Sequence, residues 1–317
     1  SILERTPDSA EPDPRCVLVA GASGAIGSAF CAKLAERFPD AQLIRMARAP
    51  QSLEPPQNPT VDIGLDIADE QNIRRAVARI PEALPIDWAF IATGWLHDSA
   101  HTPEKTYKRL DAEHLLHAYR INAVGPALLL KHLITRFNPV RACRVGIVSA
   151  RVGSISDNRL GGWHAYRASK AALNMLIKNF AIELARKSPA HIVVGLQPGT
   201  TDTPLSAPFQ RNVPDGQLQT PEYTATQLLR VMAALRVEDS GGLYDYLGQP
   251  IAPSAGEWHD VYCFSRCGNA ALETIGRVDV LQPTREALIA PTGWASQNQD
   301  GRCPLCIPQP CFDIMPW

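Results

Sequence analysis

Short apolar runs alternate with amphipathic stretches along most of the chain. Unbroken runs such as CVLVA at 16–20 suit strands buried on both faces. Strands are expected at 16–20, 41–47, 61–67, 86–94, 143–150, 191–199 and 242–248. Helices are expected at 28–38, 69–80, 111–137, 165–187 and 221–235. This alternation predicts an α/β fold with a doubly wound parallel sheet, which binds its ligands at the carboxyl ends of the strands.

The pattern is lost at both ends of the chain. Residues 1–14 are polar and proline-rich, and we expect a flexible leader. Residues 254–317 show no sustained period and are expected to form an irregular tail. Cys303, Cys306 and Cys311 lie in this tail, but a closed zinc site needs four suitably spaced ligands. We therefore predict one domain over 15–253 and no metal site.

Composition excludes several classes of partner. The 317 residues include 31 Lys plus Arg and 32 Asp plus Glu, so no charge imbalance favours nucleic acid. No apolar run approaches the roughly 20 residues of a membrane-spanning helix. We expect a cytoplasmic protein without a nucleic-acid or membrane partner. Cys16, Cys31 and Cys143 lie in apolar stretches and are expected to be reduced core residues.

A glycine-rich loop follows the first predicted strand. GASGAIG at 21–27 has its glycines at 21, 24 and 27 and leads into a helix. Glycines let the backbone approach a pyrophosphate, and the amides at the helix start then face the anion. A tight strand-to-helix turn is the alternative for the loop alone. In this context we predict dinucleotide binding by a Rossmann-type fold.

The end of the second strand indicates which dinucleotide binds. The segment RMARAP at 45–50 carries no carboxylate that would bind the ribose hydroxyls of NAD. Arg48, with Arg45 as the lesser candidate, favours NADP(H) over NAD(H). The alternative is that both arginines are solvated surface residues.

Tyr166 and Lys170 stand four residues apart in HAYRASKAALN. Residues at i and i+4 share one face of a helix, so their polar ends can meet. Alone, this spacing is also compatible with a packed tyrosine beside a solvated lysine.

Together, these motifs and the strand order resemble the short-chain dehydrogenase/reductase family over residues 15–253. Within it, ATGWLHD, SARVGSISDN and GGWHAYRASKAALN look most like the C-factor-like carbonyl reductases. The family's N-N-A-G stretch appears here as IATG, without either asparagine. The resemblance implies cofactor contacts by Gly21, Ser23, Gly24, Ile26, Gly27, Arg48, Asp66, Ile67, Ala92, Thr93, Gly94, Pro198, Gly199, Thr201 and Thr203. It also implies a homodimer or homotetramer.

The chemistry implied is hydride transfer between nicotinamide and a carbonyl or alcohol. Reduction places negative charge on oxygen, so a proton donor is needed. Tyr166 would be the acid in reduction and the base in oxidation. Lys170 would lower the pKa of Tyr166 and hold the nicotinamide ribose. The resemblance assigns Asn122 to a water-mediated proton relay.

The sequence leaves three alternatives for the family's serine. Counting back from Gly153 places that serine at Ala150. Ser149 turns inward if the strand has already ended, Ser154 substitutes for it, or the enzyme lacks this donor. We favour Ser149.

The substrate side is expected to include Trp95, His97, Trp163 and the loop 205–218. This lining suits a hydrophobic or aromatic carbonyl or alcohol, as in a carbonyl reductase or alcohol dehydrogenase. The alternative is a cofactor-binding signalling or regulatory protein with weakened catalysis. Retention of Tyr166 and Lys170 favours the enzyme.

Overall fold

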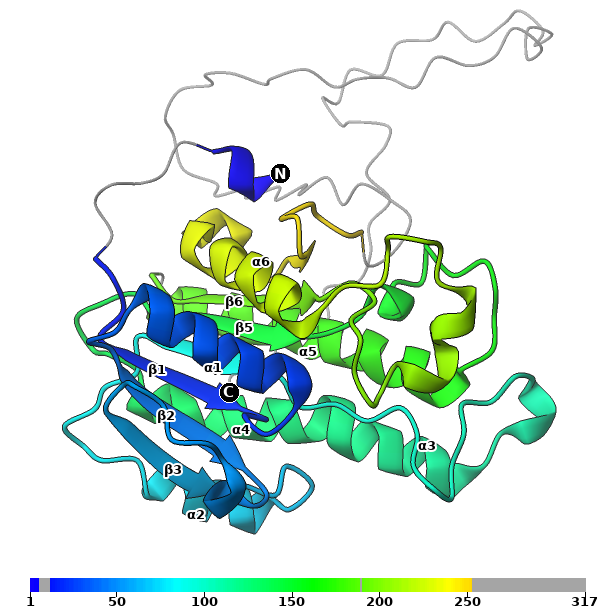
Figure 1. The fold of residues 1–317 in the computed structure, drawn as a ribbon, viewed down its shortest axis with the longest axis horizontal. Coiled ribbons are helices and arrows are strands. Elements are labelled where there is room, and N and C mark those ends of the chain that lie inside the picture. Colours follow the sequence, from blue (N-terminus) through cyan, green and yellow to red (C-terminus); the bar gives the residue numbers. More distant parts are fainter. Residues whose placement is uncertain (6–11, 189, 253–317) are drawn as a thin grey trace, which may run out of the picture. The chain divides into compact units, whose positions relative to one another are not determined.

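The structure is a computed structural model that describes all residues except 6–11, 189 and 253–317. The predicted tail and its cysteines therefore lie outside the described residues. Seven parallel strands form one sheet in the order β3-β2-β1-β4-β5-β6-β7 (Figure 1). They are β1 (Cys16–Ala20), β2 (Gln42–Ala47), β3 (Thr60–Gly64), β4 (Trp88–Ile91), β5 (Arg144–Val148), β6 (Ile192–Gln197) and β7 (Leu243–Asp245). The strand order reverses between β1 and β4, which confirms the predicted doubly wound sheet.

Helices cover both faces of the sheet (Figure 1). They are α1 (Ala25–Arg37), α2 (Glu70–Ala78), α3 (Ala112–Tyr119), α4 (Gly125–Leu133), α5 (His164–Lys187) and α6 (Pro221–Ala234). Shorter 3-10 turns lie at Ile2–Glu4, Pro50–Ser52, Tyr107–Arg109, Ile134–Arg136, Arg151–Gly153, Ala207–Asn212 and Val237–Asp239. Apolar side chains of α1 and α6 pack on one face, and those of α2, α4 and α5 pack on the other.

The unbroken apolar run of β1 follows from burial on both faces. Val17 and Val19 join the core under α1 and α6, whereas Leu18 and Ala20 join the core under α2, α4 and α5. All five residues of the strand are buried. Because no position of β1 faces water, the alternation of an exposed strand is absent.

The helix expected over 111–137 is divided by a wider turn. Arg120–Val124 form a π-helical turn in which the Gly125 N–H donates to the Arg120 carbonyl. The turn widens where Pro126 has no N–H for the regular helical bond. A Cβ at Gly125 would collide with the Ile67 carbonyl, so glycine permits the close approach of this helix to the loop after β3.

Part of the leader expected to be flexible is packed against the domain. Ile2 is 2% exposed, and its N–H donates to the Gly248 carbonyl at 3.0 Å. Arg5 forms an ion pair with Asp239 at 2.8 Å. Burial of one apolar side chain and this ion pair hold residues 1–5 against the segments that flank β7.

The three cysteines before residue 253 are free thiols in the core. Burial raises the pKa of Cys16 and of Cys31 to about 12, and it raises that of Cys143 well above the ordinary value. These thiols therefore stay protonated and pack as small apolar groups, as their positions in apolar runs suggest.

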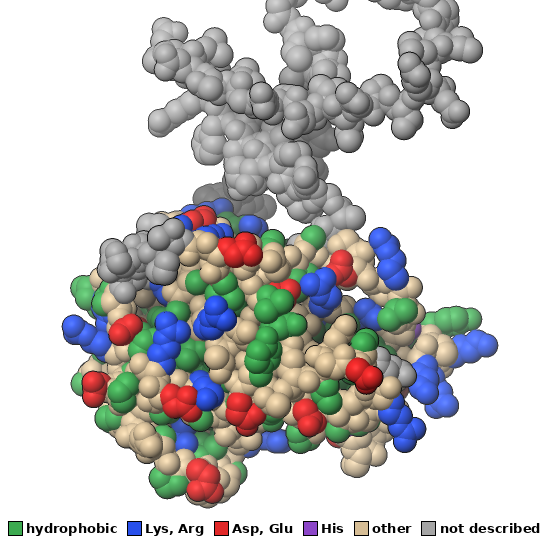
Figure 2. Space-filling view, turned by 45° about the horizontal axis from the view of Figure 1, so that its top comes forward, with side chains coloured by type: hydrophobic (Ala, Val, Ile, Leu, Met, Phe, Trp, Pro, Cys, Tyr) green, Lys and Arg blue, Asp and Glu red, His purple; other side chains and the backbone are tan. Residues whose placement is uncertain are grey.

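Charged side chains of both signs are interspersed on the face drawn in Figure 2. This face carries no extended area of one sign, in line with the near-zero formal charge of the chain. Within the described part of the chain, the helices are too short or too polar to cross a membrane.

Candidate active site

The loop between β1 and α1 has the backbone that the glycine motif predicts. Gly21 adopts φ +82°, in the left-handed region, and its N–H donates to the Met46 carbonyl at 2.9 Å. A Cβ at Gly27 would collide with the Gly21 carbonyl. Two of the three glycines are thus required by the tight path from strand to helix.

The N-terminus of α1 differs from those of α2, α3 and α6. Its N-cap, Gly24, offers no side-chain hydrogen bond. The N-caps of α2, α3 and α6, namely Asp69, Asp111 and Thr220, each accept a bond from a backbone amide. Ser23 and Gly24 are exposed. The first amides of α1 therefore remain available to an anion such as a pyrophosphate.

The two candidate arginines after the glycine loop have different environments. Arg45 is 6% exposed and binds Asp62 through two bonds of 2.7 Å, with a third bond of 2.7 Å to the Glu54 carbonyl. Arg48 is exposed and has no ion pair with any described residue. The structure thus removes Arg45 as a phosphate ligand and leaves Arg48.

The segments after β3 and β4 carry the residues that are predicted to form the cofactor wall. Asp66 is exposed beyond the end of β3. The Thr93 hydroxyl is buried and has no hydrogen-bond partner in the described part of the chain. Gly94 is exposed, and a Cβ there would lie 3.8 Å from both Asn122 Oδ1 and Lys170 Nζ. The wall therefore adjoins the predicted catalytic residues.

Tyr166 and Lys170 lie together on α5, with Lys170 Nζ 5.8 Å from the centre of the Tyr166 ring. Lys170 is 2% exposed, and Nζ donates to the Val148 carbonyl at 3.0 Å. Burial lowers the pKa of Lys170 to about 8. The Tyr166 hydroxyl bonds to no described residue, so it is available to a ligand.

Desolvation raises the pKa of Tyr166 to about 12, although part of the residue is exposed. This direction is opposite to the one expected from a neighbouring ammonium. The physical reason is that loss of water around the phenol outweighs any attraction of a phenolate to Lys170. The phenol is thus fully protonated near neutral pH, which suits an acid.

Asn122 is fully buried at the π-helical turn. Its Oδ1 accepts from the Trp95 N–H at 2.7 Å, and its Nδ2 donates to the Trp95 carbonyl at 2.8 Å and to Ser169 Oγ at 3.0 Å. The side chain therefore fixes the loop after β4 beside Lys170. Its part in a water relay stays a prediction.

The candidate serines both donate to other partners. β5 ends at Val148, and the Ser149 hydroxyl donates to Asn174 Oδ1 at 2.6 Å. Ser154 is 1% exposed, and its hydroxyl donates to the Ala252 carbonyl at 2.5 Å. In this structure both hydroxyls are engaged with protein acceptors, and which of the three alternatives holds stays a prediction.

The segment after β6 combines a sharp turn with packed threonines. Gly199 has φ +76°. Thr201 is 3% exposed, and its hydroxyl lies 2.9 Å from the Thr224 hydroxyl on α6. Thr203 Oγ1 lies 3.4 Å from Ser206 Oγ and is partly exposed. Thr203 is thus better placed than Thr201 to offer its side chain to a ligand.

Two of the predicted substrate residues meet through a third aromatic ring. The Phe209 ring centre lies 4.8 Å from that of Trp163 and 5.6 Å from that of His97. His97 Nε2 is 3.1 Å from the Leu205 carbonyl, and the Trp163 and Tyr166 rings are 6.3 Å apart. Three loops therefore bring an aromatic cluster to Tyr166.

Trp95 has a different set of partners. Its ring meets His117 at 4.6 Å, His114 at 5.2 Å and His101 at 5.7 Å, all edge to face. His114 and His117 belong to α3. The backbone of Trp95 is held by Asn122, so Trp95 links α3 to the predicted catalytic residues.

Sequence reasoning missed Phe209 and Glu104. Phe209 lies inside the loop 205–218 that was expected to line the substrate side, but no motif singles it out. Glu104 lies in a polar stretch and is nevertheless 3% exposed, with its carboxylate at the start of α5. No local pattern distinguishes a buried carboxylate in a loop from a solvated one.

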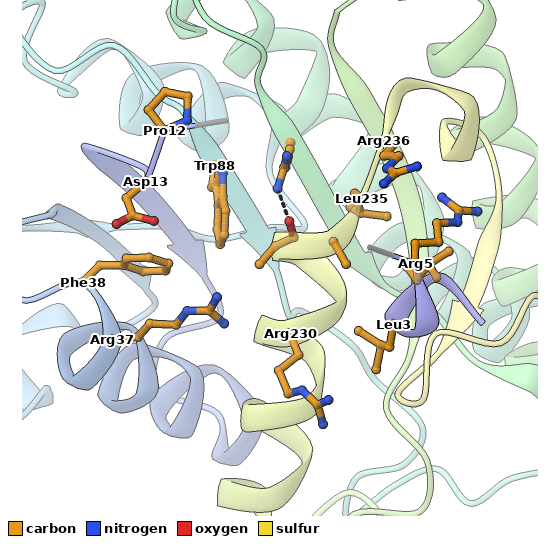
Figure 3. A pocket seen from close by; sticks show the side chains of 14 residues that line it. Leu3, Arg5, Pro12, Asp13, Arg37, Phe38, Trp88, Arg230, Leu235 and Arg236 are labelled. Atoms are coloured by element: carbon orange, nitrogen blue, oxygen red, sulfur yellow. Dashed lines mark hydrogen bonds between the residues drawn. The ribbon is translucent and has the colours of Figure 1, made fainter. Parts of the chain in front are cut away.

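A cavity of about 340 Å³ lies at the opposite edge of the sheet, where β4 and β5 begin (Figure 3). Phe38 and Trp88 form part of its wall. Arg144 donates to the Met232 and Ala233 carbonyls in the last turn of α6. None of the predicted site residues lines this cavity. The candidate active site therefore lies at the carboxyl ends of the strands, the carboxyl edge of the sheet, together with the open glycine loop and Tyr166.

Within the described ranges no group of His, Cys, Asp and Glu side chains is arranged to hold a metal ion. The cysteines considered for zinc fall in 253–317, outside the description.

Comparison with known proteins places the chain in a family. The short chain dehydrogenase family matches residues 15–214, more than half of the chain. A 1-hydroxy-2-glutathionyl-2-methyl-3-butene dehydrogenase of Rhodococcus sp. (strain AD45) is 31% identical over 185 residues, 57% of this chain and 75% of that protein. C-signal of Myxococcus xanthus is 32% identical over 142 residues, 45% of this chain and 80% of that protein.

Solved structures agree on the fold. An NADPH-bound carbonyl reductase from chicken fatty liver has a TM-score of 0.64 at 23% identity, covering 76% of this chain and 95% of that one. The chain belongs to the short-chain dehydrogenase/reductase family of oxidoreductases. The resemblance to C-factor-like carbonyl reductases is thereby confirmed.

Proposed function

We propose that this protein is an NADP(H)-dependent oxidoreductase that interconverts a carbonyl compound and its alcohol, with Tyr166 as acid and base. The observation that carries this proposal is the Tyr166 hydroxyl, free of described partners, on the same helix as the buried Lys170, whose Nζ lies 5.8 Å from the centre of the Tyr166 ring. A binding module has no need for a desolvated phenol and lysine on one helix face.

The residues present fit a dinucleotide. The uncapped amides of α1 and the turn at Gly21 suit a pyrophosphate, and the buried Thr93 hydroxyl lacks a protein partner in the described residues. Asp66, Gly94 and Thr203 complete the proposed contacts. When bound, nicotinamide supplies or accepts the hydride.

The side chains then handle the proton. In reduction the protonated Tyr166 donates to the oxygen as negative charge develops there. Lys170, charged below its pKa of about 8, stabilises the phenolate left behind. A Cβ at Gly94 would lie 3.8 Å from both Lys170 Nζ and Asn122 Oδ1, so a ligand group beside Gly94 would be in contact range of both. In oxidation the same proton moves in the opposite direction.

Tyr166 carries this task without Ser149 or Ser154, because both hydroxyls donate elsewhere. Losing one donor to a developing oxyanion costs about 2.7 to 4 kcal/mol in transition-state stabilisation. The aromatic cluster of His97, Trp163 and Phe209 offers an apolar surface next to Tyr166. Aldehydes, aromatic ketones and quinones, which combine a reactive carbonyl with apolar surface, are therefore the proposed substrates.

Arg48 supports NADP(H) as the cofactor. It is exposed and unpaired in the described chain, so it can bind a 2′-phosphate, and the chicken carbonyl reductase was solved with NADPH. Arg48→Ala should weaken NADPH binding by about tenfold and leave NADH binding within about twofold. Fluorescence titration of both cofactors measures this. Equal affinity of the parent protein for NADPH and NADH would contradict the assignment.

A screen of NADPH oxidation tests the activity itself. Aldehydes, aromatic ketones, quinones and aliphatic ketones are compared at one pH, and the first three classes should turn over faster than the last. NADPH binding without oxidation by any class would instead favour the second candidate, a cofactor-binding signalling protein. The 32% sequence identity to C-signal over 142 residues is the observation behind that candidate.

We also propose self-association, as the family resemblance implies. Leu116 on α3, Val124 in the π-helical turn and Met175 on α5 are large apolar side chains with 58%, 45% and 62% exposure. Light scattering coupled to gel filtration should give a dimer or tetramer. A monomer at micromolar concentration would contradict this.

A further inference from the structure

Helix α5 carries Tyr166 but supplies no side-chain cap for its own N-terminus. Its N-cap is Trp163, in the left-handed conformation with φ 51° and ψ 43°, and the Trp163 side chain makes no capping bond. An indole cannot accept bonds from the first helical amides. Without help from elsewhere, the turn that contains Tyr166 would be prone to fray.

Glu104 provides the missing cap from a distant loop. Both of its carboxylate oxygens lie 3.3 Å from the Ala165 N–H, and its backbone carbonyl accepts from the Trp163 N–H at 2.5 Å. A Cβ at Gly162 would come within 3.3 Å of the same carbonyl. The main chain and the side chain of Glu104 thus both hold the start of α5.

The cap provided by Glu104 is buried, unlike an ordinary helix cap at the surface. Glu104 is 3% exposed, and a carboxylate in such a place is costly unless it is hydrogen-bonded or neutralised. The positive end of the α5 dipole and the Ala165 amide meet that requirement. A solvated cap such as Asp69 on α2 needs no such burial.

The other side of Glu104 faces α3. His114 Nδ1 lies 3.8 Å from Glu104 Oε1, and the His114 ring packs edge to face on Trp95 at 5.2 Å. The Trp95 backbone is bound by Asn122. Glu104 therefore connects the helix of Tyr166 with the part of the site that holds Asn122.

We infer that Glu104 is a positioning residue that fixes the first turn of α5, and with it the direction of the Tyr166 hydroxyl. This role rests on the proposed function of Tyr166. Lys170 lies one turn further and has its own anchor, the Val148 carbonyl at 3.0 Å. Loss of Glu104 should therefore displace the proton donor and spare Lys170 and the cofactor contacts.

Three variants and one control test the inference. Glu104→Ala removes the acceptor, Glu104→Asp withdraws the carboxylate by one methylene, and Glu104→Gln retains an acceptor for Ala165. Asp69→Ala removes the side-chain cap of α2, away from Tyr166. Each protein is compared with the parent for kcat with the best carbonyl and for Kd of NADPH.

Glu104→Ala and Glu104→Asp should lower kcat by about tenfold or more, because small displacements of a reacting group are costly. Kd for NADPH should stay within about twofold, and Glu104→Gln should recover kcat to within about threefold of the parent. Asp69→Ala should leave kcat unchanged. Parent-like kcat in Glu104→Asp, or equal losses of kcat and NADPH affinity, would overturn the inference; Glu104→Asp decides it if Glu104→Ala does not fold.

Amide hydrogen exchange separates this inference from the proposed function. The Ala165 amide should exchange at least about tenfold faster in Glu104→Asp than in the parent, with the amide of Lys170 unchanged. Unchanged exchange at Ala165 would overturn the role of Glu104. Faster exchange combined with full activity of Tyr166→Phe would instead overturn the proposed chemistry of Tyr166.

Discussion

Asp87 lies at the amino edge of the sheet, where the strands begin, and Tyr166 lies at the carboxyl edge, where the strands end. The two polar side chains differ in how many hydrogen-bond partners the protein gives them. The Asp87 carboxylate is 2% exposed and accepts from the Arg15 and Cys16 amides at 2.6 and 3.2 Å. It also binds Asn138 at 2.8 Å and Arg141 at 3.1 Å. The Tyr166 hydroxyl bonds to no described residue.

The same contrast extends along both edges. Near Asp87, the Arg144 guanidinium donates to two carbonyls in the last turn of α6 and lies over the Trp88 ring. At the carboxyl edge, the Thr93 hydroxyl has no protein partner among the described residues, and the first amides of α1 have no side-chain cap. Satisfied polar groups stabilise the fold, whereas groups left open are available to ligands.

The largest expected effect is on the amino edge. Asp87→Ala removes the acceptor of the Arg15 and Cys16 amides and breaks the bonds to Asn138 and to Arg141 Nη1, so the free energy of unfolding should fall by about 3 to 5 kcal/mol. Urea unfolding measures it. The Tyr166 hydroxyl makes no hydrogen bond in the described chain. The free energy of unfolding of Tyr166→Phe should therefore stay within about 0.5 kcal/mol of that of the parent. Equal stability of the two variants would contradict the claim that Asp87 stabilises the fold and the Tyr166 hydroxyl does not.

The next effect concerns pH. Burial sets the pKa of Lys170 at about 8, so its ammonium is present below pH 8 and is lost as pH rises through that value. The kcat of carbonyl reduction should be level below pH 8 and fall about tenfold per unit above it. In Lys170→Arg the guanidinium stays charged, so the break near pH 8 should vanish even though activity is lower. If the break near pH 8 persists in Lys170→Arg, the titrating group is not Lys170.

The smallest effect is expected at the serines. Ser149→Ala and Ser154→Ala each remove a hydroxyl that donates to Asn174 or to the Ala252 carbonyl, so kcat should stay within about threefold of the parent. Steady-state kinetics with the best carbonyl measures both variants. A loss of about 10²-fold in Ser149→Ala would restore Ser149 as the second donor.

Patterns local in sequence predicted much of the fold and of the site. Burial of β1 on both faces requires an apolar run, and helical spacing alone brings Tyr166 and Lys170 together. The glycine positions follow from the turn that they make. These features depend on a few neighbouring residues, so the sequence carries them directly.

Features that depend on packing between distant segments could not be predicted in the same way. The pairing of Arg45 with Asp62 needs the register of β2 and β3, in which these two residues are opposite each other. The cap from Glu104 crosses 61 residues to Ala165. Desolvation of Tyr166 reflects the whole environment of the phenol, so the direction of its pKa shift is not visible in a motif.

The most direct test of the account is Tyr166→Phe, which removes one hydroxyl from the carboxyl edge. Kd for NADPH, measured by fluorescence titration, should stay within about twofold of the parent. The kcat for the best carbonyl should fall by about 10²-fold or more, because the proton donor is gone. A Tyr166→Phe protein that reduces that carbonyl at the parent rate would show that the open hydroxyl takes no part in the reaction.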